Sequence, residues 1–558
     1  MIRVFQGDEA FSLLSDPEFR RKWSSLYHDC PYATCFQGVQ FITVWYRCYA
    51  EKFDPLIVVD GVEQESLRGL MLLAVSKENG KLSVAGTHHA EYQVWLEAEG
   101  QLTSFVEPAL DRLAEMFPKG QLEFLFLPPG TPLQVSERWG KRFQWRPIPR
   151  GLMSTEPGNA IASKLKTQSV KRRLNQLQRA GKLSFERILG PEEFSLALDE
   201  VIPFYDFRQG AMYGTLPFAA DPQKKQFYLA MMEQIGLLHV TVLRLDGRIV
   251  AAQIGPMNKQ QVVLGIIAHS PFLSRYSLGR IHILYLGIQL EKERLEAFDL
   301  TPGGKYKERF ASHHDEAYVL KVFFRRSDAV RYKLQRHAIN IAKRFVSTEQ
   351  IKKVVGLLRH KVRLTSPFAL PAKLIRRLRG ALWSTRELRI YRFDPSRVKF
   401  GASEAIMRRD CLEDLLLYVP SESWQPTLSE FLREAMHRLG GGHHVYTRVL
   451  DGRLVHYGWL IERQLECELT EVNQKLTWPP NSAVLYDYYT HPLYRGKGLY
   501  KNSLQQMLEC AATIPGTEHI CISVSQDNIA SRHVIEGAGF TYERSLFQRF
   551  RFGVTKRW

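Results

Sequence analysis

The sequence predicts an α/β protein made of three consecutive units with mixed sheets, with a basic helical connector before the last unit. Apolar runs rich in β-branched residues alternate with helical stretches along the chain, which is the pattern of α/β domains. An Asp-Gly turn between two such runs, the signal of a β-hairpin, occurs at 246–247 and again at 451–452. At 558 residues the chain exceeds the size of a single core. We place the units at residues 1–160, 161–327 and 386–558, and the connector at residues 328–385.

The first unit is predicted from its alternation of strands and helices. The expected elements are a strand near 2–5, helical stretches to about 49, strands at 55–59 and 67–75, a strand entering a loop at 81–95, a helix at 102–116 and a strand at 122–127. Pro128, Pro129 and Gly130 then end the last strand.

The second unit begins with a basic stretch that we expect to form one long helix over residues 163–181. Its apolar residues make a single stripe, which consists of Leu165, Val170, Leu174 and Leu177. Gly181 is a natural C-terminal cap. Each Asp-Gly hairpin is followed at a comparable distance by a strand, a turn and an apolar helix, which predicts an internal repeat. In the second unit this turn spans 274–280, where Leu278 replaces a glycine and argues against phosphate binding.

The net charge of +18 is concentrated in one stretch of the chain. Residues 325–380 carry 16 Lys or Arg against two acids, a surplus of 14. Segments 351–359 and 374–379 mix apolar and basic residues at helical spacing. Three interpretations stay open: a solvated helical connector, peripheral association of residues 328–380 with an anionic membrane, or nucleic-acid binding, with tRNA the least favoured partner.

The sequence also indicates the cellular compartment in which we expect the protein. The first residues show no signal-peptide pattern, and the longest apolar runs, such as 69–75 and 262–268, fall short of the roughly 20 residues that a spanning helix needs. The seven cysteines are an odd number, and they lack the Cys-x-x-Cys spacing of structural zinc sites. We therefore expect a cytoplasmic protein with reduced thiols and no metal, with or without peripheral attachment at the inner face of the membrane.

A glycine-rich turn near the C-terminus carries the clearest chemistry. The β-rich run 484–490 leads into Arg495-Gly496-Lys497-Gly498, after which a Leu-rich helix begins. The first N–H groups of such a helix are unpaired and point at the turn together with the positive end of the helix dipole, which suits a pyrophosphate. Gly496 and Gly498 let the backbone approach phosphate oxygens, although a plain strand-turn-helix reversal also uses glycines.

The residues after this turn complete a known pattern. An apolar strand at 519–524 is followed by Asn528-x-x-Ser531 and by Gly539-Phe540. With these motifs, residues 484–550 resemble the GNAT acetyltransferase superfamily. The resemblance implies an acyl-CoA transferase that uses acetyl-CoA as acyl donor. It assigns the CoA to Tyr489, Arg495, Gly496, Lys497, Gly498, Leu499, Tyr500, Asn528 and Ser531.

One departure concerns the acid that protonates the leaving thiolate. Many members of the superfamily have a tyrosine seven residues after the Asn, and this chain has Ile535 there. Tyr500, Tyr542 or water is then the expected substitute. Asp487 and His491, at the end of the strand, are the expected bases, directly or through water, although such residues are often only turn or edge residues.

Residues 1–330 resemble a second family, the CelD-like acetyltransferases linked to cellulose and exopolysaccharide production. The resemblance rests on the basic helix 163–181, the segment 205–210, the first Asp-Gly hairpin with the turn after it, and the run Phe298-Asp299 to Lys305-Tyr306-Lys307. It implies two GNAT-like halves, so that the chain has three such folds. A carboxylate at a strand end beside two ammonium groups suits an anionic or polyhydroxylated ligand. The expected substrate residues here are Arg208, Asp299, Lys305, Tyr306 and Lys307.

We therefore expect an acyl-CoA-dependent acyltransferase that acts on an amine or hydroxyl of a sugar or surface-polymer precursor. Two alternatives stay open. One is a Fem-like transferase that uses aminoacyl-tRNA, and the other is a non-catalytic protein that senses CoA or organises an exopolysaccharide system. The oligomeric state is not predicted.

Overall fold

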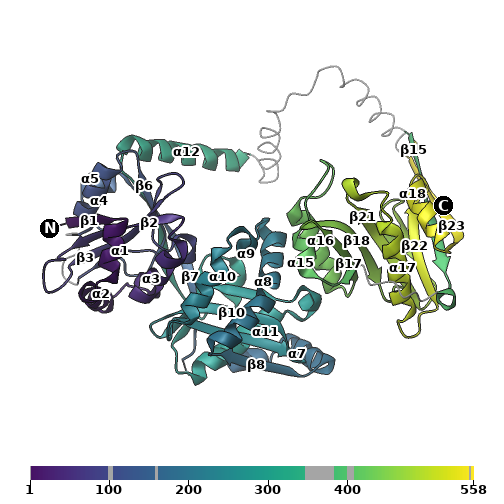
Figure 1. Ribbon diagram of the computed structural model, residues 1–558, viewed down its shortest axis with the longest axis horizontal. Helices are drawn as coiled ribbons and strands as arrows, with labels where there is room; N and C mark the ends of the chain where they lie inside the picture. Colours follow the sequence, from purple (N-terminus) through teal and green to yellow (C-terminus); the bar gives the residue numbers. More distant parts are fainter. Residues whose placement is uncertain (1, 99–104, 157–160, 346–382, 399–406, 552–553) are drawn as a thin grey trace, which may run out of the picture. The chain divides into compact units, whose positions relative to one another are not determined.

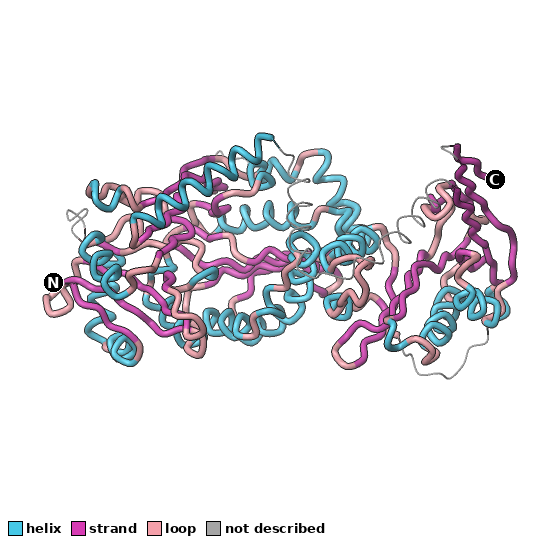
Figure 2. The backbone as a smooth tube through the Cα atoms, turned by 90° about the horizontal axis from the view of Figure 1, so that it is seen from above, coloured by secondary structure: helices cyan, strands magenta, loops and turns pink. Residues whose placement is uncertain are grey.

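The computed structural model describes residues 2–98, 105–156, 161–345, 383–398, 407–551 and 554–558 (Figure 1). The chain divides into two compact units. The first unit comprises residues 1–205, 218–269 and 276–357, and the second comprises residues 206–217, 270–275 and 358–558. In the first unit, helices lie on both sides of the strands (Figure 2).

The first unit begins with a five-stranded antiparallel sheet. Its order is β1 (Ile2–Gln6), β2 (Phe53–Asp60), β3 (Gly69–Ser76) and β4 (Leu82–Val84), with β5 (Leu96–Glu97) also on β3. The helices around it are α1 (Asp8–Ser15), α2 (Pro17–Asp29), α3 (Val39–Tyr49) and α4 (Val106–Met116). Strands β2 and β3 are buried along almost their whole length because both faces of the sheet are covered. The predicted strands and helices of this region are present.

A nine-stranded mixed sheet follows. Its order is β6 (Gln121–Leu127), β14 (His313–Phe323), β7 (Phe143–Ser154), β13 (Ala297–Pro302), β11 (Gln261–Val263), β10 (Arg248–Asn258), β9 (Leu238–Leu245) and β8 (Leu183–Ile188), with β12 (Ile266–His269) also on β10. Strand β14 pairs antiparallel with both β6 and β7. Residue 160, the predicted boundary, therefore lies between two strands of one sheet and does not separate two sheets.

The helices of this region are α6 (Ile161–Leu165), α7 (Gln168–Ala180), α8 (Pro191–Tyr213), α9 (Pro217–Ala220), α10 (Gln223–Met232) and α11 (Leu278–Lys292). The prediction of a single helix at 163–181 is wrong, because the helix is interrupted between Leu165 and Gln168. Thr167 has an extended backbone and is the N-cap of α7, and its hydroxyl donates back to the carbonyl of Lys164 at 2.8 Å, so α6 ends before it and α7 begins after it. The predicted stripe persists, since Val170 and Leu177 are buried.

The predicted connector begins as a helix. Helix α12 (Arg326–Phe345) starts just before residue 328, and the amphipathic segments predicted at 351–359 and 374–379 lie outside the described residues. Among the helices that the structure describes, none has the length and apolarity to cross a membrane.

The C-terminal part of the second unit is built on an eight-stranded sheet. Its order is β16 (Arg408–Arg409), β17 (His444–Leu450), β18 (Arg453–Ile461), β21 (Ser482–Thr490), β22 (His519–Ser525), β15 (Trp383–Phe393), β23 (Thr541–Arg551) and β24 (Val554–Arg557). A separate hairpin consists of β19 (Glu466–Leu469) and β20 (Gln474–Thr477). The helices are α15 (Leu412–Leu416), α16 (Leu428–Gly440), α17 (Leu499–Ala512) and α18 (Ile529–Gly537).

The two large sheets have the same order of strands. The run β13-β11-β10-β9-β8 of the first unit corresponds to β22-β21-β18-β17-β16 of the second, and each contains an antiparallel Asp-Gly hairpin followed by one parallel pair. In each case a helix, α11 or α17, connects the two parallel strands. The internal repeat that the two hairpins predict is therefore present.

Candidate active site

Strands β21 and β22 pair in parallel only at their beginnings. The pairing covers four residue pairs, from Ser482 opposite His519 to Leu485 opposite Ile522. Beyond this point β21 continues along β18, and β22 continues along β15. The two strands therefore separate, and we call the point beyond Leu485 and Ile522 the strand fork.

A β-bulge bends β21 just after the fork. Its register on β18 passes from Tyr486 opposite Trp459 to Tyr489 opposite Tyr457, so two residues of β21 face one residue of β18. Asp487, within the bulge, has a φ of +49°. Bulges of this kind redirect side chains, and here the carboxylate of Asp487 accepts a hydrogen bond from Nη1 of Arg438 on α16.

The glycine turn, residues 495–500, lies between β21 and α17. Gly496 and Gly498 have φ values of +76° and +77°, and a Cβ placed on either would meet nothing within 4 Å. Gly498 is the N-cap of α17, so the free N–H groups of the first helical turn face this open space. Arg495 and Lys497 are exposed beside it. An open backbone surface, a helix N-terminus and two cations fit the pyrophosphate of CoA.

Tyr500 lies near the fork, in the first turn of α17. Its ring is 4.8 Å from that of Tyr488 on β21, and the nearby side chain of Ser531 on α18 acts to lower its pKa. Burial raises the pKa of Tyr500, so the phenol stays protonated at neutral pH. Ile535 is 0% exposed in the core and has no proton to offer.

Asn528 and Ser531 start the helix after β22. Asn528 is the N-cap of α18, and its Oδ1 accepts the backbone N–H of Ser531 at 3.1 Å. This contact fixes α18 at the end of β22, on the other side of the fork from the bulge.

His491 has a capping role in this structure. Its Nδ1 accepts the N–H of Leu493 at 3.3 Å at the start of the 3-10 helix η7 (Pro492–Tyr494), and its Nε2 lies 3.3 Å from Nη1 of Arg453. Burial and the nearby arginines lower the pKa of His491. A neutral imidazole has one acceptor nitrogen, and each of these two partners is a donor, so the lone pair of His491 is used within the protein in either tautomer.

Sequence reasoning missed His456, which lies opposite Thr490 in the sheet. It is 0% exposed, its Nδ1 is 2.8 Å from the hydroxyl of Thr490, and its Nε2 has no hydrogen-bond partner among the described residues. Its ring centre is 6.3 Å from that of Tyr500. Burial lowers the pKa of His456 to about 4. Within β18 it follows the ordinary alternation of an apolar strand, so no sequence signal distinguishes it.

On the α16 face of the sheet, a cavity of about 340 Å³ adjoins the bulge. We call it the aromatic pocket. It is lined by Tyr418, Trp424, Gln425, Pro426, Glu430, Phe431, Glu434, Ala435, Arg438, Tyr457, Trp459, Asp487, Tyr488 and Tyr489. The predicted base Asp487 and the predicted CoA residue Tyr489 thus both line one cavity.

In the first unit, the predicted substrate residue Asp299 lies within β13 and is 0% exposed. Its Oδ2 accepts from the hydroxyl of Tyr92 at 2.8 Å and from Nη1 of Arg150 at 3.1 Å. Burial raises the pKa of Asp299, and the Arg150 cation opposes that effect. The cation that pairs with Asp299 is Arg150, which sequence reasoning missed.

The other predicted residues of this group are arranged differently. Lys307 lies in the 3-10 helix η4 (Lys305–Arg309), and its Nζ donates to the hydroxyl of Thr301 at 2.8 Å. Lys305 and Tyr306 are exposed. Asp299 and Lys307 both contact Thr301, whose backbone N–H donates to Oδ1 of Asp299 at 2.8 Å, whereas Arg208, on α8, belongs to the other compact unit.

The turn before α11 differs from the glycine turn. The N-cap of α11 is Ser277, with a φ of +56°, and Leu278 is buried. Ser277, and not Leu278, thus takes the conformation that Gly498 has before α17. A side chain is present where the C-terminal turn is open, so this turn offers less exposed backbone to a phosphate than the glycine turn does.

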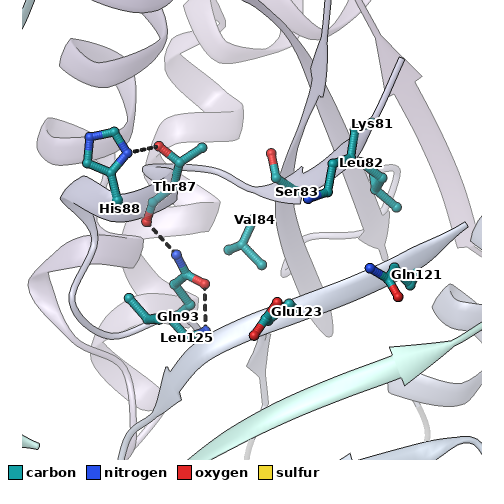
Figure 3. Close-up of a pocket in the computed structure, with 10 residues that line it drawn as sticks. All are labelled: Lys81, Leu82, Ser83, Val84, Thr87, His88, Gln93, Gln121, Glu123 and Leu125. Atoms are coloured by element: carbon teal, nitrogen blue, oxygen red, sulfur yellow. Dashed lines mark hydrogen bonds between the residues drawn. The ribbon is translucent and has the colours of Figure 1, made fainter. Parts of the chain in front are cut away.

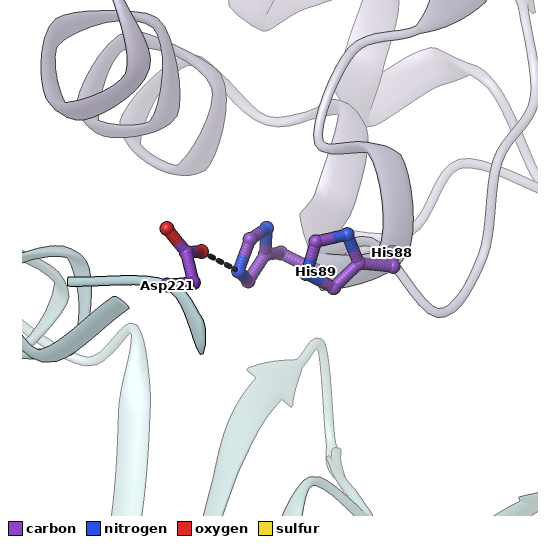
Figure 4. Close-up of side chains that lie close together, drawn as sticks. All are labelled: His88, His89 and Asp221. Carbon is purple, nitrogen blue, oxygen red and sulfur yellow. Dashed lines mark ion pairs between the residues drawn. The ribbon is translucent and has the colours of Figure 1, made fainter. Parts of the chain in front are cut away.

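The first unit also contains a second cavity and a cluster of possible metal ligands. A cavity of about 370 Å³ lies beside β4 and β6, and Gln93 links the two sides of it by donating to the carbonyl of Thr87 at 2.5 Å and accepting from the N–H of Leu125 at 2.8 Å (Figure 3). His88, His89 and Asp221 form the cluster (Figure 4).

The ligand atoms of His88, His89 and Asp221 lie within 4.8 Å of one another, and these are residue types that bind zinc. The carboxylate of Asp221, however, already accepts from the hydroxyl of Tyr49 at 2.7 Å and from Nζ of Lys52 at 2.8 Å. Burial lowers the pKa of His89 to about 2, so this ring is neutral at physiological pH. The nearby lysine charge disfavours a bound cation.

Two family models match the chain. Residues 164–311 match one model described as an acetyltransferase (GNAT) domain, and residues 419–541 match a second model of the same description. Both segments are GNAT acetyltransferase domains. The strand fork, the bulge and the glycine turn all lie within the C-terminal GNAT domain. The CelD-like relationship of residues 1–330 stays a prediction, and no curated protein matches the chain.

Solved structures with similar folds include members of several classes. The C-terminal domain of a putative lysylphosphatidylglycerol synthetase from Agrobacterium fabrum is 12% identical, with 57% of this chain and 96% of that chain covered and a TM-score of 0.36. L-PGS from Bacillus licheniformis is 12% identical, with 58% and 97% covered and a TM-score of 0.36. A tandem GNAT protein from the clavulanic acid biosynthesis pathway is 13% identical, with 67% and 100% covered and a TM-score of 0.22.

Proposed function

We propose that the C-terminal GNAT domain transfers an acyl group, with acetyl favoured, from CoA to an amine or hydroxyl of a sugar or surface-polymer precursor. The observation that carries the proposal is the combination of the strand fork with an open glycine turn at the N-terminus of α17. The turn suits a pyrophosphate, and this proposal puts the thioester arm where β21 and β22 cease to pair, beyond Leu485 and Ile522.

The residues around the fork suit acyl transfer. In this proposal the amides of residues 495–500 bind the pyrophosphate, and Asn528 lies beside the arm. The N–H groups of the bulge polarise the thioester carbonyl as the acceptor attacks it. The acceptor's proton passes through water to Asp487. Tyr500, kept protonated by burial, gives a proton to the departing thiolate in place of the missing tyrosine at Ile535.

Calorimetry of the full chain with acetyl-CoA tests the proposal. We expect binding that is lost in Gly498→Asp, because a carboxylate then stands where the phosphate is held. Steady release of free CoA in the presence of a cell extract would exclude the non-catalytic alternative. Absence of binding at millimolar acetyl-CoA would refute the proposal.

A second candidate function has one observation in its favour. Residues 161–182 carry seven Lys or Arg and no acid, and on α7 Lys171, Arg172 and Arg179 are exposed while Val170 and Leu177 pack inward. An anionic partner such as the tRNA of a Fem-like aminoacyl transferase fits this surface. Fluorescence anisotropy with aminoacyl-tRNA at several salt concentrations tests it, and equal affinity for unrelated RNA would count against it.

A further inference from the structure

We infer that the acceptor is an amino sugar with a free primary amine, and that it binds in the aromatic pocket with its amine beside Asp487. The inference rests on the proposed function, because it names the acceptor of the same site. It also selects the amine over the hydroxyl.

The position of the pocket supports this assignment. Asp487, Tyr488 and Tyr489, which line it, belong to the part of β21 that has separated from β22. A ligand in the pocket therefore lies against the same bulge that borders the fork. An amine held at Asp487 is next to the space that the proposed function gives to the thioester.

The charge of the pocket favours a cation. Three carboxylates line it, those of Glu430, Glu434 and Asp487, against the single guanidinium of Arg438, so the excess is 3 − 1 = 2 negative charges. Arg438 is itself held by Asp487 and by Glu434, whose Oε1 is 3.0 Å from its Nε. Hydrogen bonds from Thr427 lower the pKa of Glu430 and keep it charged. An ammonium group is attracted to this pocket, and an anion is repelled.

The walls of the pocket are aromatic. The rings of Tyr457 and Tyr489 are stacked with centres 5.3 Å apart, and those of Tyr418 and Phe431 are stacked at 4.0 Å. Trp424 lines the pocket and is 73% exposed. Aromatic faces suit a flat apolar surface, such as the C–H face of a sugar ring, at low cost in side-chain entropy. The volume of about 340 Å³ is near the lower end of ligand pockets, ~300–1,000 Å³, and suits one ring better than a polymer segment.

Two hydrogen-bond donors distinguish a sugar from a plain aromatic amine. Trp459 lines the pocket, is 1% exposed, and its Nε1 has no hydrogen-bond partner among the described residues. Nε2 of Gln425, another lining residue, is also buried without a partner in the described chain. Buried donors of this kind are costly unless an acceptor reaches them. Hydroxyl oxygens of a sugar supply such acceptors, whereas an arylalkylamine has none.

The reaction balances without a further reactant. The ammonium loses a proton to Asp487 through water, and the amine nitrogen attacks the thioester carbonyl carbon. The C–N bond forms, the C–S bond breaks, and the thiolate takes a proton from Tyr500, which regains one from solvent. The products are the N-acyl amino sugar and free CoA.

Release of CoA by the full chain with acetyl-CoA and four probes tests the inference. The probes are glucosamine, glucose, N-acetylglucosamine and phenethylamine. We expect kcat/KM for glucosamine to exceed that for each of the others by about tenfold or more, since a site built around polar groups rejects analogues that leave those groups unpaired. Glu434→Gln should raise KM for glucosamine about fivefold with little change in kcat, as loss of one exposed charge predicts. The matched control is Glu468→Gln on the exposed hairpin β19–β20.

A binding readout keeps this test independent of turnover. Glucosamine should change the tryptophan fluorescence of the full chain, and Trp424→Ala should remove most of that change. The inference would be overturned if glucose or phenethylamine reacted as well as glucosamine, or if KM were unchanged in Glu434→Gln. In either case binding of acetyl-CoA would leave the proposed function intact. No fluorescence change with glucosamine would also overturn it. Loss of the proposed function itself appears as failure to bind acetyl-CoA.

Discussion

Gly498 and Gly442 form a matched pair of glycines for separating phosphate binding from backbone strain. Gly498 caps α17 with a φ of +77°, and Gly442, just after α16, has a φ of +84°. A Cβ placed on either residue meets nothing within 4 Å. An alanine at either position therefore causes strain without a clash, and only at Gly498 does the new methyl group enter the space proposed for the pyrophosphate.

The expected sizes of the two effects differ. A non-glycine residue in the left-handed region costs about 1–2 kcal/mol, so both Gly498→Ala and Gly442→Ala should lower the melting temperature by a few degrees. A methyl group between the amides and a phosphate oxygen removes at least one charged hydrogen bond, which contributes ~1.5–3 kcal/mol. Acetyl-CoA affinity should therefore fall roughly tenfold to a hundredfold in Gly498→Ala alone.

Thermal unfolding and isothermal titration of the full chain measure both effects on the same samples. Equal melting temperatures with a selective loss of acetyl-CoA affinity in Gly498→Ala support phosphate binding at the glycine turn. Affinity lost equally in both variants, or in neither, would refute the reasoning, because the turn would then have only a structural role.

Three other substitutions test separate parts of the account. Tyr500→Phe should lower kcat by about tenfold or more, the usual contribution of an acid, with acetyl-CoA affinity unchanged by calorimetry; an unchanged kcat would make water the proton donor. His456 has a pKa of about 4 in the folded protein, below its unfolded value, so its contribution to stability is lost as pH falls from about 6.5 to 4. His456→Gln should flatten that part of the stability curve in urea unfolding, by up to ~3 kcal/mol, whereas the exposed control His533→Gln should not. Arg150→Met leaves the buried Asp299 carboxylate unpaired and should destabilise the first unit by ~3–5 kcal/mol in urea unfolding; a loss below 1 kcal/mol would show that the carboxyl is neutral there.

Local patterns predict much of the C-terminal site. The glycines of the turn, the helix after it and the strand at 519–524 follow from backbone rules that act over a few residues. Asn528 is also a local feature, because an N-cap depends only on the next helical turn. The sequence therefore predicts where a pyrophosphate would bind before any tertiary contact is known.

The acceptor side depends on contacts that are distant in sequence. Arg438 reaches Asp487 across 49 residues, and His456 meets Thr490 only through the register of β18 and β21. Periodicity shows these residues as ordinary members of a helix and a strand. The same limit explains Arg150, which meets Asp299 across 149 residues. The position of His491 at the end of a strand predicts a base. A contact only two residues away, with the N–H of Leu493, instead makes it a helix cap.

The strand order has a consequence for cutting the protein into pieces. A fragment that begins at residue 161 retains β14 but loses both of its neighbours, β6 and β7, so this eleven-residue strand is left without a partner and its backbone groups are unpaired. Such a fragment should aggregate or fail to fold. Residues 383–558 carry all eight strands of their own sheet, but a fragment cut there loses residues 206–217 and 270–275 of the same compact unit, including the Ala211 carbonyl that accepts from the hydroxyl of Ser429 on α16.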